Sequence, residues 1–461
     1  MSTRHYRKAA ALALVASVGL SVAACSSSSK NDAGANGKTT IVVDCAPPKT
    51  QNNGQDLVRW NNDIAAFEKI HTDVVIRSES VGTQCDNPPD FTARLQGGTE
   101  ADVYYGYFTD TNQVLDLDQA ADISSYINSS TVPNWSSVQQ TWKTPFADGG
   151  KQYGIPTNNY TMGLVINKKL FTQAGLDPTK PPQTWAEVAA DAKKISALGN
   201  GIYGYSDYSA NHTGGWHFTA ELYSLGGELT TADGKKADFN NAMGQQVLQN
   251  LYNMRWNDNS VGQKQLLQWG DLLTNAGAGK VGMYIGAPDS ITSIVTTFKG
   301  NYSDWAMGPM PGADGYGKAA LAGGNGYFFR KGDTAAQIKA GLEWISYEFL
   351  TPGQGQFDYK AMASEKLAVG LPEPQLFTAG SAADTQAGKL AKQYETVNPA
   401  DYATYISNPI TPKGEPANAQ PLYAVLDGPM STVLTQHNAN IPQLLGTAEK
   451  QVNQVLSTPT S

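Results

Sequence analysis

Residues 149–195 have the sequence GGKQYGIPTNNYTMGLVINKKLFTQAGLDPTKPPQTWAEVAADAKKI, and this stretch decides the fold. It predicts extended segments over residues 153–166, broken by Pro156. Thr184 and Glu187 have the spacing of a capping box, in which each side chain satisfies a free backbone amide of the first turn. A helix is therefore predicted to begin directly after Thr184, so the stretch passes from strand to helix as an α/β unit does.

Strands and helices alternate on both sides of this stretch, which predicts α/β units with parallel strands. A length of 461 residues exceeds the roughly 250–300 residues that one core usually reaches, so about two domains are expected. From Thr334 onward the pattern becomes almost wholly helical. The predicted strands are 39–45, 74–81, 101–107, 202–206, 280–286, 304–311 and 324–330.

The composition excludes several classes of protein. Apolar residues make up 40% and aromatic residues 10% of the chain, so it can bury cores, which excludes disorder throughout and a small stapled scaffold. The 33 Lys and Arg residues against 41 Asp and Glu residues give a net charge of −8 without a long basic run, so no nucleic-acid partner is expected. Phosphate-loop, zinc-protease and serine-hydrolase motifs are also lacking, so we expect no catalytic residue, cofactor or metal.

Residues 1–24 are predicted to be a lipoprotein signal peptide. Cationic residues precede an apolar run from Ala9 to Ala24 that is short for a bilayer span. The run ends in Val-Ala-Ala-Cys, which looks like a bacterial lipobox, so the Cys25 thiol is expected to take the diacylglyceryl anchor, with palmitate as its acyl chain. Residues 25–38 are small and polar and predict a flexible tether. The chain is thus expected outside the cytoplasm, anchored to the bacterial cell membrane; an ordinary secretory signal with an incidental cysteine is the alternative.

Two further cysteines, Cys45 and Cys85, follow two predicted strands that a βαβ unit places side by side. An even pair of thiols in an oxidising compartment favours a disulfide. Free thiols and metal ligation are the alternatives.

Aromatic side chains gather near the predicted strand ends, together with amides and carboxylates. Ligands of open α/β sheets bind beyond the carboxyl ends of the strands. A sugar stacks its C–H face on an aromatic ring, while its hydroxyls bond to amides and carboxylates, so the pattern favours a carbohydrate site. Trp60, Trp185 and Trp344 lie instead on apolar helix faces and are predicted to be core residues. The candidate ligand contacts in these segments are Tyr107, Asp110, Asn158, Asn159, Tyr160, Tyr205, Trp216 and His217.

Several stretches resemble the family 1 extracellular solute-binding proteins, the carbohydrate-binding lipoproteins of bacterial ABC importers. The main match is residues 149–195, with Y-G-I-P, an apolar strand ending in N-K, L-F-x-x-A-G-L-D-P, and T-W-x-E opening a helix. Supporting matches are ADVYYGYFTDTNQVLDLDQ, AGKVGMYIGAPDS, DWAMGPMPGADGYG followed by GGNGYFF, and GLEWISYEFL. The resemblance spans about residues 39–360, with a weaker helical end to about residue 456.

This resemblance implies an α/β, periplasmic-binding-protein-like fold: two α/β lobes, a three-segment hinge and a ligand cleft between the lobes. The crossings are expected near residues 154–160, 286–292 and 329–335. The implied lobes are residues 39–154 with 290–330, and residues 160–286 with 334–456.

The resemblance also assigns roles within the cleft. The family's usual aromatic stacking position falls on Trp216. The family often has a second Trp after the strand of the AGKVGM motif, but this chain has Ala287-Pro288-Asp289 there, which leaves Asp289 as a hydroxyl acceptor. The residues expected near the same ligand, from the hinge and the opposite lobe, are Asn158, Asn159, Tyr160 and Asn325.

The leading hypothesis is a membrane-tethered, monomeric receptor that captures a mono- or oligosaccharide by lobe closure. It would deliver the sugar to the transmembrane subunits of an ABC permease. Two alternatives stay open: a binding protein for a peptide, polyamine or phosphodiester, and a tethered glycosidase that uses a carboxylate pair. A polyamine pocket would also favour acids and aromatic rings, so composition alone does not separate these ligands.

Overall fold

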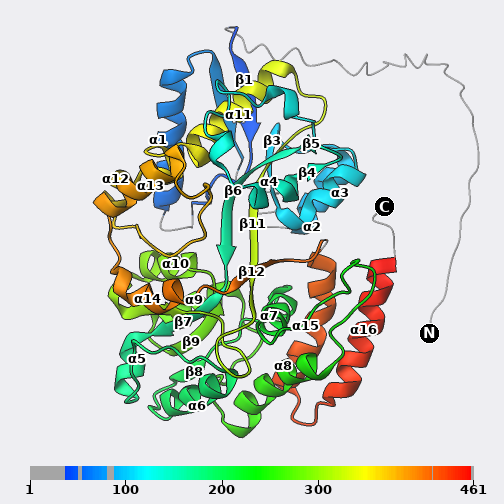
Figure 1. Cartoon of the computed structure of the whole chain (residues 1–461), viewed down its shortest axis with the longest axis vertical. Helices are drawn as coiled ribbons and strands as arrows, with labels where there is room; N and C mark the ends of the chain where they lie inside the picture. Colours follow the sequence, from blue (N-terminus) through cyan, green and yellow to red (C-terminus); the bar gives the residue numbers. More distant parts are fainter. Residues whose placement is uncertain (1–36, 50–53, 80–87, 418, 458–461) are drawn as a thin grey trace, which may run out of the picture.

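The computed structural model describes residues 37–49, 54–79, 88–417 and 419–457. The chain forms two halves, each with its own sheet and helices, joined by strands that run from one half to the other (Figure 1). We call the half that contains the first strand the first lobe, and the other half the second lobe. The predicted signal peptide with Cys25 lies outside the described residues, so both remain predictions.

The larger sheet consists of β1 (Thr39–Val43), β2 (Val74–Ser78), β3 (Val103–Tyr107), β6 (Gly154–Thr161), β11 (Ala319–Phe329) and β12 (Thr411–Gly414), and it extends from the first lobe through the connecting strands to β12 in the second lobe (Figure 1). Its order is β12-β11-β3-β1-β2, and β6 also pairs with β11. β1 runs parallel to β2 and β3, as the sequence predicted, whereas β11 runs antiparallel to β3 and β6. Ile41 and Val43 are fully buried between the layers. A separate two-stranded hairpin is formed by β4 (Ala147–Asp148) and β5 (Lys151–Gln152).

The sheet of the second lobe consists of β7 (Gly163–Asn167), β8 (Tyr203–Tyr205), β9 (Val281–Gly286) and β10 (Trp305–Gly308), in the order β10-β7-β9-β8. β8 and β9 are parallel, while β7 is antiparallel to both β9 and β10. The strands β7 and β9 are buried along their whole length, because helices cover them on both faces.

Helices cover both sheets (Figure 1). The first lobe contains α1 (Gln55–Ile70), α2 (Pro88–Gly97), α3 (Thr111–Asp116), α4 (Gln140–Lys143), α11 (Ala335–Leu350), α12 (Tyr359–Ser364) and α13 (Ala382–Gln393). The second lobe contains α5 (Lys168–Gln173), α6 (Trp185–Ser196), α7 (Thr213–Ser224), α8 (Ala242–Tyr252), α9 (Trp269–Gly277), α10 (Asp289–Phe298), α14 (Ala403–Ser407), α15 (Ala419–Thr435) and α16 (Ile441–Ser457). The predicted capping box of α6 is confirmed, since Thr184 and Glu187 bond to each other's backbone N–H at 3.1 Å. Among the described residues no helix is long and apolar enough to cross a membrane.

Three connections join the lobes. β6 and β11 run side by side between them, and the third connection leads from α13 to α14 (Figure 1). The crossing predicted at 154–160 corresponds to β6. The crossing predicted at 286–292 is wrong, because this segment turns from β9 into α10 inside the second lobe. The crossing expected near 329–335 lies earlier, in β11, which is longer than the predicted strand 324–330.

The lobe boundaries differ from the predicted ones in two places. α11 belongs to the first lobe, because Trp344 packs edge-on against Trp60 at 5.3 Å and against Phe67 at 5.4 Å between ring centroids. α10 and β10 belong to the second lobe, because α10 packs on α9 and β10 pairs with β7. Assigning all of 334–456 to lobe two and all of 290–330 to lobe one was therefore wrong. The sequence pattern predicts helices and strands, but it does not predict against which sheet a helix such as α11 packs.

Candidate functional site

The crossing strands bring three of the predicted residues into one row. In the strand register, Asn325 of β11 lies opposite Tyr107 of β3 on one side and opposite Asn158 of β6 on the other. The Thr157 hydroxyl lies 3.1 Å from Oδ1 of Asn325 and donates to it, which holds this amide in place. Asn158 is exposed, and Asn325 and Tyr107 are half-buried. This row therefore presents amide and phenol groups next to the connection between the lobes.

Trp216 lies in the first turn of α7 and contacts β6 through Tyr160. Its Nε1–H donates to the hydroxyl of Tyr160 at 3.1 Å, and the two rings meet edge to face with centroids 6.0 Å apart. Tyr208 packs beside the indole at 6.4 Å. The Trp216 ring is half-buried, so part of it is open to a ligand. We call Tyr107, Asn158, Tyr160, Trp216 and Asn325 the crossing cluster.

The start of α7 is fixed by a residue that sequence reasoning missed. The carboxylate of Asp427 on α15 accepts the backbone N–H of His212 at 2.7 Å and that of Gly215 at 2.9 Å. A Cβ on Gly215 would lie 2.3 Å from the backbone of Tyr423, so the glycine lets α7 and α15 pack closely. Gly215 therefore serves the contact between these two helices.

Tyr205 and His217, two predicted ligand contacts, are fully buried behind the crossing cluster. Nδ1 of His217 lies 2.7 Å from Oδ1 of Asp207, and Tyr205 packs on Trp185 in the core of the second lobe. Neither side chain reaches the open side of Trp216. Both were placed in the site because they stand near a strand end, but their side chains point inward from the sheet and the helix.

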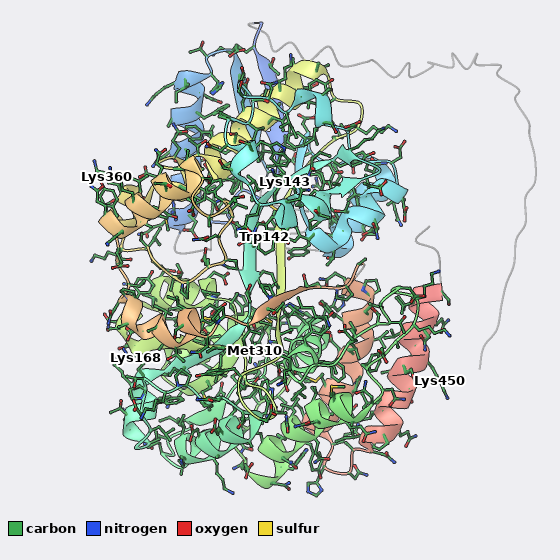
Figure 2. All side chains as sticks on the ribbon, viewed as in Figure 1. Trp142, Lys143, Lys168, Met310, Lys360 and Lys450 are labelled. Atoms are coloured by element: carbon green, nitrogen blue, oxygen red, sulfur yellow. The ribbon has the colours of Figure 1, made fainter. Side chains whose placement is uncertain are left out.

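Asn159 and a second indole, Trp142, lie on the first-lobe side of the site. With its amide oriented to satisfy both neighbours, Asn159 donates to the carbonyl oxygen of Pro374 at 2.8 Å and accepts from Nε1 of Trp142 at 2.9 Å. Trp142 also stacks on Phe108, with ring centroids 6.1 Å apart. Figure 2 shows Trp142 beside β6, where the first lobe approaches the second. The sequence signal for Trp142 was weak, because it stands in a short helix without a motif.

Carboxylates surround the crossing cluster, and one of them, Glu415, was missed. Burial raises the pKa of Glu415 to about 7, although the hydrogen bond from the Tyr423 hydroxyl acts in the opposite direction. Asp110 is buried, and its Oδ2 accepts the backbone N–H of Tyr107 at 2.7 Å. The only sequence signal for Glu415 is that it is an acid between Gly414 and Pro416 in a connecting segment.

Two further carboxylates, Asp289 and Glu373, lie at the second-lobe side and on the third connection. Both are exposed, yet nearby protein atoms displace enough water to raise the pKa of each, to about 7 for Glu373. The negative charge of Asp289 also raises the pKa of Glu373 and of Tyr208, so these groups lie close to one another. Asp289 lies in the first turn of α10, and its role as a hydroxyl acceptor stays a prediction.

Cationic side chains stay away from this group of acids. Among the described residues, no Lys or Arg forms an ion pair with Glu415, Asp289 or Glu373. Lys143, next to Trp142, turns its ammonium over the ring of Trp135 at 4.6 Å. Figure 2 shows three other labelled lysines, Lys168, Lys360 and Lys450, at the outer edges of the molecule.

The described residues contain no group of His, Cys, Asp and Glu side chains that could hold a metal ion. Two surface hollows, of about 410 and 480 Å³, lie between α15 and α16 and along α6. None of the predicted site residues lines either hollow. Cys45 follows β1 as predicted, but Cys85 lies outside the described residues, so their pairing stays a prediction.

A family model for bacterial extracellular solute-binding proteins matches residues 53–352. The chain belongs to this family. Its fold is accordingly that of the periplasmic binding proteins, with two α/β lobes, three connecting segments and a ligand cleft between the lobes. In this solute-binding protein the crossing cluster lies at the strands that join the two lobes.

Curated relatives are similar over only part of their length. A putative binding protein of Brucella abortus (strain 2308) is 30% identical over 146 residues, which are 31% of this chain and 34% of the relative. The sn-glycerol-3-phosphate-binding periplasmic protein UgpB of Yersinia pestis bv. Antiqua (strain Antiqua) is 30% identical over 153 residues, which are 33% of this chain and 27% of the relative. The matched segment thus spans about a third of these relatives.

Solved structures match across nearly the whole chain. The solute-binding protein of an ABC transporter from Thermotoga lettingae TMO, bound with α-D-tagatose, has a TM-score of 0.69 and 19% identity. The match covers 91% of this chain and 100% of that one. This similarity extends the shared fold beyond the segment that the family model matches.

Proposed function

We propose that this solute-binding protein captures a carbohydrate for an ABC importer. The observation that carries the proposal is the crossing cluster: a half-open indole is bonded to Tyr160 of β6, the strand that also carries Asn158 and pairs with β11 at Asn325. An indole face suits the C–H face of a sugar ring, and the amides and carboxylates suit its hydroxyls. The sugar-bound relative from Thermotoga lettingae shares the fold and supports the same ligand class.

The charge of the site favours a sugar over a phosphodiester. Phosphate groups are usually held by Arg or Lys side chains, or by backbone amides at helix N-termini. Here Glu415, Asp289 and Glu373 border the cleft without a cationic partner among the described residues. A phosphate would meet like charge there, whereas a neutral hydroxyl would meet good acceptors. These acids therefore favour a neutral ligand, although a segment of the chain is similar to UgpB.

Lobe closure gives the mechanism of capture. A ligand shifts an open–closed equilibrium only by binding the closed state more tightly, so it must contact both lobes. Trp216 contributes from the second lobe, and Tyr107 and Asn325 contribute from the sheet of the first lobe. A monomer whose Cys25 carries a lipid anchor, with residues 25–38 as its tether, would then present the sugar to the permease subunits at the membrane. A Cys45–Cys85 disulfide would stabilise the first lobe.

The test is to identify the bound solute and measure its affinity. Purified protein is denatured and the released small molecules are analysed by mass spectrometry. Calorimetric titrations then compare maltotriose, glycerophosphocholine and spermidine as representatives of the three ligand classes. A released sugar, or binding of the neutral oligosaccharide alone, supports the proposal. A released phosphodiester or polyamine overturns it, and cleavage of the sugar during long incubation would favour the tethered glycosidase.

A further inference from the structure

Glu415 occupies a fixed position at the centre of the connection between the lobes. It follows β12 directly, and its backbone N–H donates to the carbonyl oxygen of Ala322 on β11 at 3.1 Å. Its side chain lies over Gly323, where a Cβ would come within 2.6 Å of Oε2 of Glu415. The glycine therefore makes the space that the carboxylate fills, and any larger residue at 323 would displace it.

A chain of polar groups links this carboxylate to the indole of Trp216. Oε1 of Glu415 accepts from the hydroxyl of Tyr423 at 3.1 Å. The Tyr160 hydroxyl is a neighbour of Oε2, since each would lie 2.6 Å from a Cβ on Gly323, and hydrogen bonding between Tyr160 and Glu415 contributes to the pKa of both groups. That hydroxyl accepts from Nε1 of Trp216 at 3.1 Å. The polar groups thus form a series: the N–H of Trp216 at the cleft, the hydroxyl of Tyr160, and the carboxylate of Glu415 next to β12.

We propose that Glu415 is a positioning residue of the ligand cleft, which sets the Trp216 ring through the hydroxyl of Tyr160 and makes ligand affinity depend on pH. Tyr160 has one hydroxyl proton. When Glu415 is ionised, that proton is directed to the carboxylate, and the phenol oxygen is left free to accept from Trp216. When Glu415 carries a proton, its own O–H competes for the phenol oxygen, and the link to the indole weakens.

The surroundings of Glu415 cause its carboxyl group to gain or lose its proton near neutral pH. Burial raises the pKa of Glu415 to about 7, and the charge of Asp110 adds to the effect. The titratable groups that face Glu415 are Asp110 from the first lobe, Tyr160 from β6, and Tyr423 from α15. Tyr223 of α7 also senses its charge. Lys413 of β12, two residues before Glu415, is paired with Glu228, and its ammonium lies over the ring of Tyr223 at 4.2 Å.

The experiment is a double-mutant cycle on ligand affinity. The variants are Glu415→Gln, Tyr160→Phe and the combination of the two, titrated with the sugar at pH 5.5, 7 and 8.5. We expect wild-type affinity to fall about fivefold to twentyfold from pH 8.5 to 5.5, with a midpoint near 7. Each single variant should bind at the low-pH level at every pH. The double variant should bind no more weakly than either single variant, because both substitutions interrupt the same series of polar groups between Glu415 and Trp216.

A control and a ligand-free readout keep the result interpretable. Glu449→Gln changes a carboxylate on α16 that accepts a hydrogen bond from the amide of Asn240 at 2.8 Å, and it should leave the pH profile intact. Without ligand, the tryptophan emission of the wild type should shift near pH 7, and this shift should be absent in Glu415→Gln and Trp216→Phe. Melting temperatures of all variants report whether they are folded.

Two results would overturn the inference: additive losses in the double variant, or a wild-type pH profile retained by Glu415→Gln. The inference concerns the cleft of the proposed function and rests on that function for its ligand titrations. A wild type that binds no sugar would overturn the proposed function. A wild type that binds sugar with pH-independent affinity and emission would overturn only the role of Glu415.

Discussion

Two aromatic clusters of this protein use the same residue types in opposite ways. In the first lobe, Trp344 packs against Trp60 and Phe67, and all three rings are buried. The N–H groups of both indoles are buried without a hydrogen-bond partner among the described residues. In the crossing cluster, the N–H of Trp216 is bonded and its ring is half open. We infer that the buried rings without polar contacts stabilise the first lobe. The ring of Trp216, which is held by a hydrogen bond and partly exposed, is suited to bind a ligand.

The largest expected effect is on the buried cluster. Trp344→Ala would remove a fully buried indole from between α1 and α11 and leave a cavity that rigid neighbours cannot fill. Such changes cost about 3–5 kcal/mol of unfolding free energy. Chemical denaturation should show this loss, while sugar affinity of the folded fraction stays within about twofold of wild type. A large loss of affinity at unchanged stability would erase the distinction between the two clusters.

A somewhat smaller loss is expected from the proposed disulfide of the first lobe. Cys45→Ser would remove a bridge to Cys85 that closes a loop of about 40 residues, worth roughly 3–4 kcal/mol in the chain-entropy model. Thermal melts of the variant and of reduced wild type should fall together. Peptide mapping without reductant should find neither thiol alkylated. Two freely alkylated thiols would refute the bridge.

Trp216→Ala is expected to act on binding instead of folding. A ring stacked on a sugar contributes on the order of 2–3 kcal/mol, so affinity should weaken by about 30–150-fold, with only a small change in melting temperature. Trp256→Ala is the matched control, because this half-buried indole lies on the second lobe and bonds to the carbonyl oxygen of Val433. The control should lose stability and keep affinity. The reverse pattern would make Trp216 a core residue.

The smallest expected effect concerns how two carboxyl groups make the stability of the protein depend on pH. Burial raises the pKa of Glu100 in the first lobe and of Glu415 in the cleft to about 7. The folded protein then binds more protons than the unfolded chain between about pH 4.5 and 7, so stability falls as pH rises through this window. Replacing either residue by Gln should remove roughly 1–3 kcal/mol of that fall.

Only one of these two changes should alter ligand binding. Glu100 lies in the first lobe with both carboxylate oxygens buried and without a partner among the described residues. Glu415 instead bonds to Tyr423 beside Tyr160 and Trp216. Calorimetry across pH should therefore show a changed sugar affinity for Glu415→Gln and an unchanged one for Glu100→Gln. Equal effects on binding would mean that both act only through overall stability.

Local signals predicted much of the fold. The capping box of Thr184 and Glu187 placed α6, and the alternation of strands and helices placed β1, β2, β3, β8 and β9. Trp216 was also found locally, because it opens a helix after a strand. These features depend on neighbours a few residues apart, which is the range over which backbone hydrogen bonds and caps act.

What the sequence did not predict depends on contacts between distant segments. Glu415 and Tyr160 lie close together in space but far apart in the sequence, where no spacing rule applies. In the same way, Asp427 caps α7 from another helix. The same reason explains why α11 was assigned to the wrong lobe and why Tyr205 and His217 proved to be buried. Periodicity shows which face of an element is apolar, but not which partner will cover it.

The most direct test of the central claim is a crystal structure of the protein with its sugar bound. We expect a sugar ring stacked on the face of Trp216, within about 4 Å of the indole. Asn158 or Asn325 should bond to its hydroxyls, and both lobes should contact it. A sugar held away from Trp216, for example in the hollow between α15 and α16, would contradict it.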